Sequence, residues 1–169
     1  MKNFLDLVNK RYSYRGYLNK DVEQEKIDYI LKCANLAPSA ANRQPWKIYL
    51  VKNYETRKKL AEAYPKEWLI EAPIIVVFTG IKDNNWIRND GKNYLMCDVT
   101  IIADYFILAA AEVGLGTCYI AAFDEKKVIS TLKLPENEIP FLITPLGYPK
   151  ENVIRPRKRK DLEEIIVNV

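Results

Sequence analysis

Histidine is absent from all 169 residues of this chain. Its absence excludes Ser-His-Asp and Cys-His nucleophilic sites, His-ligated zinc and iron sites, and the commonest general base near neutral pH. The chain also has no Gly-x-Gly-x-x-Gly sequence, the motif of a Rossmann dinucleotide site. If the protein is an enzyme, we expect a bound cofactor to carry the chemistry.

Cysteine is scarce, with three residues at Cys33, Cys97 and Cys118. They are far apart in the sequence and form no Cys-x-x-Cys pair, which indicates neither a disulfide framework nor a zinc site. We therefore expect reduced, buried thiols and no metal.

Long hydrophobic runs are lacking too. The longest apolar stretch, 99–111, is interrupted by Asp104 and is shorter than the roughly 18 to 20 residues that span a bilayer. The first apolar turns carry Asp6 and Lys10 and show no cleavage pattern, unlike a secretory signal. These features predict a soluble, cytoplasmic protein with no membrane partner.

Hydrophobic residues make up 49% of the chain, enough for a sizeable core, and no linker or repeat interrupts the sequence. We expect one domain, 1–169. The net charge is only +4, but five of the six residues from Arg155 to Lys160 are basic. Such a cluster needs either an anionic partner or the solvated surroundings of a tail.

Apolar periodicity and helix-stop residues divide the chain into alternating helices and strands. Helices are expected at about 4–10, 21–37, 53–64, 98–113 and 124–132, and strands at about 46–51, 74–78, 117–121 and 140–146. An Asp21–Gln24 capping box would begin the second helix, and polar residues mark 80–94 as a surface excursion. The helix at 98–113 is apolar on nearly every face, so it should be buried, in part by another subunit. The alternation predicts a three-layer α/β sandwich.

Arg11, Ser13 and Arg15 form an Arg-x-Ser-x-Arg segment near the start. Their alternate spacing in an extended stretch puts all three side chains on one side, as two guanidinium forks around a hydroxyl. A phosphate group fits this arrangement, although so short a pattern also occurs by chance.

A second pattern, Pro38-Ser-Ala-Ala-Asn-Arg-Gln-Pro-Trp46, follows the second helix. Together, these two patterns resemble the opening of the FMN-dependent nitroreductase family. A Gly-Leu-Gly that ends at Gly116 and a late basic segment followed by Leu-Glu-Glu also resemble that family, so the resemblance covers essentially the whole chain. It implies an α+β fold, a three-layer α/β/α sandwich whose central sheet is mainly antiparallel, and a C-terminal segment, 161–169, that reaches a partner subunit.

The resemblance also implies a cofactor site for FMN in a homodimer. The phosphate, the ribityl chain and the pyrimidine edge would contact the N-terminal segment, at Arg11, Tyr12, Ser13 and Arg15. The loop that reaches the flavin from the partner subunit would contribute Pro38, Ser39, Ala40 and Asn42, with Gln44 structural or near the ring. A backbone amide facing flavin N5 would come from Ile120, Ala121 or Ala122, and late basic residues closing on the phosphate would be Arg157 and Arg159.

The implied activity is hydride transfer from NAD(P)H through flavin N5 to a small electrophilic acceptor such as a nitroaromatic or a quinone. The NAD(P)H would bind only transiently, in a ping-pong mechanism. Three aromatic residues could stack on an aromatic acceptor: Trp86, Tyr94 and Phe123. Lys66 could approach flavin N1 and O2 or could be a surface lysine.

The sequence departs from the family pattern at Ala121 and Ala122, where many members have an acidic residue and a glycine. Three alternatives keep the fold: a flavin reductase, a dehalogenating relative, or an enzyme fed by ferredoxin. A fourth, from a different class, is a small basic nucleic-acid-binding protein that uses the 155–160 segment.

Overall fold

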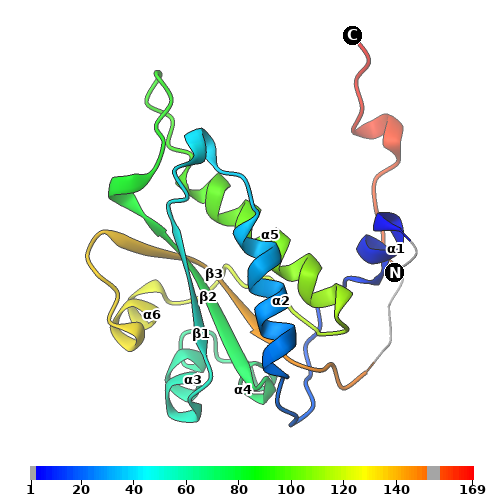
Figure 1. Cartoon of the computed structure of the whole chain (residues 1–169), viewed down its shortest axis with the longest axis vertical. Helices are drawn as coiled ribbons and strands as arrows, with labels where there is room; N and C mark the ends of the chain where they lie inside the picture. The colour runs from blue at the N-terminus through cyan, green and yellow to red at the C-terminus, as the bar shows by residue number, and fades with distance from the viewer. Residues whose placement is uncertain (1–2, 152–156) are drawn as a thin grey trace.

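The computed structural model describes residues 3–151 and 157–169 (Figure 1). Its sheet has three antiparallel strands in the order β1-β2-β3: Trp46–Val51, Ile74–Ile81 and Glu138–Leu146. Helices α2 (Gln24–Asn35) and α5 (Leu95–Glu112) cover one face. Helices α3 (Tyr54–Ala61), α4 (Glu67–Glu71) and α6 (Glu125–Leu132) cover the other. The expected α+β, three-layer arrangement is confirmed.

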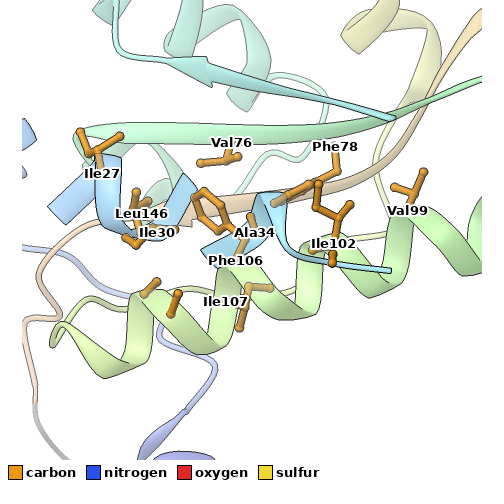
Figure 2. Packing of buried hydrophobic residues seen from close by; sticks show 14 of the residues in the cluster. Ile27, Ile30, Ala34, Val76, Phe78, Val99, Ile102, Phe106, Ile107 and Leu146 are labelled. Carbon is orange, nitrogen blue, oxygen red and sulfur yellow. The ribbon is translucent and has the colours of Figure 1, made fainter. Parts of the chain in front are cut away.

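The central strand β2 explains why its sequence is apolar without alternation. Its even-numbered residues from Ile74 to Phe78 pack against α2 and α5, and Ile75 and Val77 pack on the opposite side with Leu60 of α3. Figure 2 shows the first of these cores, in which the Phe78 and Phe106 rings meet edge to face with centroids 5.4 Å apart. A strand buried on both faces needs hydrophobic residues at every position.

Helix α5 is the longest element, but one side of it is open. Ten of its 18 residues are buried, as the apolar sequence predicts, whereas Met96 is 65% exposed and Tyr105 is 41% exposed. Gly114 follows the helix with φ of 81°, the left-handed conformation that glycine adopts at helix ends. Short helix α1 (Phe4–Lys10) contacts α5 (Figure 1).

Several expected boundaries are wrong. The capping box at the start of α2 does not form, because Glu23 is the N-cap and the Gln24 amide donates instead to Asp28 one turn later, at 2.7 Å. Helix α2 ends at Asn35, α3 ends at Ala61, and the five-residue α4 was not expected. Tertiary packing decides such short ends more than local preference does.

The predicted strand at 117–121 is also wrong. Gly116 pairs with Gly147, and Ile120 pairs with Ile143, but the stretch between them forms only these isolated bridges to the end of β3. Pro145 lies opposite the middle of the stretch and has no N–H to donate, so the ladder is broken there.

The cysteines are free thiols, as expected, but they are not all buried. Cys118 is buried, Cys33 is partly buried, and Cys97 is exposed on α5.

A buried carboxylate, Glu138, lies at the start of β3. It accepts hydrogen bonds from the Thr79 hydroxyl and from Lys47 Nζ at 2.8 Å. Burial raises the pKa of Glu138, but hydrogen bonds from Lys47, Thr79 and Tyr49 outweigh that effect and leave the pKa lowered. Burial and the same carboxylate raise the pKa of Tyr49 to about 12.

A folded-state pKa below the unfolded value means that ionised Glu138 stabilises the fold above about pH 4.3, and that this stability is lost as the pH falls through the folded pKa. Glu138→Gln should therefore lower the free energy of unfolding at pH 7 by about 1 to 2 kcal/mol, since Lys47 is half exposed. The difference from the parent protein should shrink below pH 4. Thermal unfolding at pH 7 and pH 3.5 measures both values, and a difference that stays constant with pH would contradict the assignment.

Candidate functional site

The segment from Arg11 to Arg15, here called the cradle, is extended and lies beside the stretch that follows α5. Ser13 forms a parallel bridge with Thr117, and the Tyr14 amide donates to the Thr117 carbonyl at 2.9 Å. A Cβ on Gly116 would stand 3.0 Å from the Tyr14 ring, so glycine permits this close approach. The Gly-Leu-Gly sequence thus has a packing role next to the cradle.

Tyr17 fixes the far end of the cradle. Its side chain is buried, and its hydroxyl donates to the Tyr14 carbonyl at 2.8 Å. Its amide donates to the Glu71 carboxylate at 3.0 Å, and Glu71 also pairs with Lys150 at 2.8 Å. Two residues distant in sequence, Thr117 and Glu71, therefore hold the backbone at Tyr14 and Tyr17.

The alternating side chains of the cradle affect the pKa of the buried Cys118 thiol, which is raised overall. Burial raises the pKa of Cys118, whereas the charge of Arg15, a hydrogen bond from Ser13 and the charge of Arg11 lower it. Alternate residues of an extended segment share one side, so Arg11, Ser13 and Arg15 can act on the same thiol. The intervening ring of Tyr12 lies edge to face with Tyr14, at 5.5 Å between centroids.

A pocket of about 410 Å³ opens along the cradle. It is lined by residues 12–16 together with Glu71, Lys150 and Glu151. Its volume is within the range of small-molecule sites, and it offers backbone, hydroxyl and charged groups to a polar ligand.

The two late arginines occupy different positions. Arg157 donates to the carbonyls of Val8 at 2.7 Å, of Asn9 at 2.8 Å, and of Arg11. These are carbonyls at the C-terminal end of α1, so the guanidinium caps that helix and ties the C-terminal segment to the start of the cradle. The Arg159 guanidinium contacts only the neighbouring Lys158 carbonyl, at 2.9 Å, among described residues. Arg155 lies outside the described residues.

The stretch 120–122 presents backbone amides at the edge of the sheet. The Ile120 amide already donates to Ile143, at 3.0 Å. Ala121 and Ala122 are exposed, and their amides have no acceptor within residues 3–151 and 157–169. Phe123 packs instead against the core on the α3 and α6 side.

The loop 38–44 has unusual backbone geometry. Ala41, Asn42 and Gln44 have φ of 50°, 53° and 48°, each costing on the order of 1 to 3 kcal/mol for a residue that is not glycine. The Ser39 hydroxyl accepts from the Gln44 amide, at 2.9 Å. Strained backbone persists only where the surrounding structure holds it in place, and such segments cluster at binding sites.

Asp98 of α5 holds this loop in place, a role that the sequence patterns did not indicate. The Asp98 Oδ1 atom accepts from the Ala40 amide at 2.9 Å, and its Oδ2 atom is buried with no partner in the described chain. Asp98 is 2% exposed, in the first turn of an apolar helix. The available signal was a carboxylate in the first turn of a strongly apolar helix.

Within one chain, the loop 38–44 and the cradle do not meet. The loop sits on Asp98 near the beginning of α5, and the cradle sits beside residues 116–117, after its end (Figure 1). From Asp98 to Glu112 the helix rises about 21 Å. The two halves expected of one site therefore lie at opposite ends of this helix.

The expected substrate residues are also separated. Trp86 and Tyr94 meet edge to face at 5.1 Å, at the base of a hairpin spanning 86–94, far in the fold from Phe123. Arg43 joins this hairpin to the loop 38–44 by donating to the Asn85 carbonyl at 2.7 Å. Lys66 is exposed at the start of α4.

In the part of the chain that the structure describes, no helix is long and apolar enough to cross a membrane. Over the same residues, no group of three or more acidic or cysteine side chains could hold a metal ion.

Comparison with known sequences finds one family. The model of the Nitroreductase family matches residues 8–71 and 62–148. One relative, from Methanothermobacter thermautotrophicus, carries the name NADH dehydrogenase/NAD(P)H nitroreductase. It is 31% identical to this chain over 153 residues, which cover 88% of this chain and 78% of that protein. Iodotyrosine deiodinase 1 from Sus scrofa is 30% identical over 201 residues, with 99% of this chain and 69% of the deiodinase covered.

Solved structures agree with this result. A nitroreductase family protein from Clostridium difficile 630 superposes with a TM-score of 0.88 at 32% identity, covering 98% of this chain and 97% of that chain. An FMN-dependent nitroreductase from Clostridium difficile R20291 superposes with a TM-score of 0.78 at 29% identity, covering 96% of this chain and 94% of that chain. By sequence and by fold, this chain belongs to the nitroreductase family.

Proposed function

We propose that the protein is an FMN-dependent oxidoreductase whose cofactor lies between two copies of the chain. Family membership makes the protein an oxidoreductase, and one structural relative is named as FMN-dependent. The observation that carries the proposal is the pocket along the cradle, which Ser13 and Arg15 help to line, in an extended segment whose alternate residues Arg11, Ser13 and Arg15 share one side. Residues 1–169 are taken as a single domain.

The residues of the cradle fit the polar end of FMN. Two guanidinium groups and a hydroxyl supply charge-assisted hydrogen bonds to a phosphate or to the pyrimidine edge. Arg159, which has only one local backbone contact, is the better candidate to close on the phosphate. Arg157 would act by holding the cradle against α1, because three carbonyls already occupy its donors.

When bound, FMN would supply the redox chemistry, which is hydride transfer between NAD(P)H and the acceptor. The chain's own contribution is to bind and orient. The amides of Ala121 and Ala122, which have no acceptor in the described chain, would donate toward N5. The Ile120 amide is a poorer candidate because it pairs with Ile143. None of these roles requires histidine.

A homodimer would complete the site. Since the loop 38–44 and the cradle of one chain are about 21 Å apart along α5, the loop that covers each flavin would come from the partner. Two exposed apolar surfaces would be buried by the same association: the open side of α5 around Met96 and Tyr105, and the C-terminal segment, where Ile165 and Ile166 are 61% and 52% exposed.

The natural acceptor would be a small electrophile such as a nitroaromatic or a quinone. Reductive dehalogenation is the second candidate, because the deiodinase is similar over 99% of this chain. The matched region of 201 residues exceeds the 169 residues here, so the deiodinase carries insertions that this chain lacks. With fewer residues to enclose a substrate, a broad range of acceptors is the better expectation.

Steady-state assays of the FMN-loaded protein test this activity. NADH, NADPH and reduced ferredoxin serve as donors, and a nitroaromatic, a quinone, free flavin and iodotyrosine serve as acceptors. We expect oxidation of a nicotinamide donor with parallel double-reciprocal plots, as in a ping-pong mechanism. Oxidation of ferredoxin alone would show that the proposed donor is wrong, and turnover of iodotyrosine alone would establish the second candidate.

A further inference from the structure

Strand β3 contains a proline where a hydrogen-bonding group is needed. Gly147 and Ile143 pair with Gly116 and Ile120, so the residue midway between them, Pro145, also directs its backbone toward the stretch 116–120. Alternate residues of a strand face the same neighbour, and the residue opposite Pro145 is Cys118. Proline has no N–H, so this pair loses at least one of its two ladder bonds.

The hydroxyl of Thr144 fills this break. The Cys118 amide donates to Thr144 Oγ1 at 3.1 Å, and Thr144 Oγ1 donates to the Pro145 carbonyl at 3.1 Å. One side-chain hydroxyl therefore bridges the two backbone groups that a regular ladder would join directly. Thr144 is 0% exposed, so bulk solvent does not reach this hydroxyl.

The stretch held in this way adjoins the cradle and leads into the amides of Ala121 and Ala122. Thr117 binds the cradle backbone through the Tyr14 amide, and Ala121 and Ala122 follow directly after Ile120. Between the bridges at Gly116 and Ile120, the contact of Cys118 with Thr144 is the link of this stretch to β3 within the described residues.

We propose that Thr144 is a positioning residue, whose hydroxyl sets the distance of the 117–122 backbone from a bound flavin; this inference rests on the proposed function. A small displacement of that backbone would move the amides that face N5 and would move the cradle with them. Thr144 would thus affect both the affinity for FMN and the reduction potential of the bound flavin.

Two substitutions separate the effect of the Thr144 hydroxyl from the effect of the side-chain shape. Thr144→Val keeps the shape and removes both hydrogen bonds, which leaves the Cys118 amide and the Pro145 carbonyl unpaired. Thr144→Ser keeps the hydroxyl and removes only a methyl group. Thr79→Val is the matched control, because Thr79 is also buried in the sheet but bonds to Glu138 at the opposite end of β3.

The measurements are FMN affinity by fluorescence titration, the midpoint potential of the bound flavin, and thermal stability. We expect Thr144→Val to weaken FMN binding about tenfold and to shift the potential. Thr144→Ser should stay near the parent protein in both, and Thr79→Val should lower stability alone. An unchanged affinity and potential in Thr144→Val would overturn the proposal.

Should Thr144→Val not fold, Thr144→Cys replaces the hydroxyl with a weaker hydrogen-bonding group of similar size, and a shift in potential is again expected. A cysteine variant with the parent's affinity and potential would overturn the proposal equally. If the parent protein itself binds no FMN, the proposed function fails and this inference fails with it. If the parent binds FMN and Thr144→Val binds it equally well with the same potential, only this inference fails.

Discussion

Replacing Arg11 and Arg15 together with alanine should lower the affinity for FMN by about two to four orders of magnitude. Each charge-assisted contact to a phosphate is worth about 1.5 to 3 kcal/mol, and about 1.4 kcal/mol corresponds to a factor of ten in the dissociation constant. Arg15 is exposed, Arg11 is partly exposed, and neither belongs to the hydrophobic core, so their loss should leave the core intact. Fluorescence titration of FMN gives the affinity, and circular dichroism checks the fold.

The control for this variant removes the same charge elsewhere. Lys58 and Lys59 are exposed on α3, on the far side of the sheet from α2 and α5, and the double alanine variant there should bind FMN as the parent does. If the variant lacking Arg11 and Arg15 binds FMN as tightly as the parent, the cradle does not hold the cofactor. If both double variants lose affinity equally, general electrostatic attraction is the cause and not a defined site.

A mixed dimer should recover the site that each of two defective chains lacks. One chain carries Arg15→Ala and an intact loop, and the other carries Ser39→Ala with Asn42→Ala and an intact cradle. In a dimer of the two, one site combines the intact cradle with the intact loop, and the other combines both defects. Because the dimer has two equivalent sites, the purified mixed dimer should bind about one FMN per two chains and have about half the parent's activity.

Coexpression with two different affinity tags isolates the mixed dimer, and the FMN content and activity are then compared with those of each homodimer. Neither homodimer should hold a comparable amount of flavin. If the mixed dimer holds as little FMN as either homodimer, the loop and the cradle of one chain serve the same cofactor. That result would contradict their separation along α5.

The periodicity of apolar residues predicted most of the layers, because buried positions require apolar side chains. The unbroken apolar run from Ile74 to Phe78 indicates a strand covered on both sides, and α2, α5 and the opposing helices do cover it. The stretch 117–121 has the composition of a strand, but its pairing depends on Pro145, more than twenty positions later. No local pattern contains that information.

Some features of the candidate site also follow from local sequence, and others depend on distant parts of the chain. Alternate spacing predicts that Arg11, Ser13 and Arg15 share one side of an extended segment, and Ser13 does form a bridge with Thr117. Spacing did not indicate that Arg157 caps α1, since that role depends on where the C-terminal segment crosses the first helix. Nor did it reveal the bridging hydroxyl of Thr144, because a buried threonine in a strand is ordinarily part of the core.

The absorbance spectrum of the purified protein tests the central claim most directly. We expect the near-ultraviolet and visible bands of an oxidised flavin, either as isolated or after incubation with FMN and removal of the excess, with about one flavin per chain. Addition of NADH or NADPH without oxygen should bleach the visible band. A colourless protein that takes up no FMN would contradict the account.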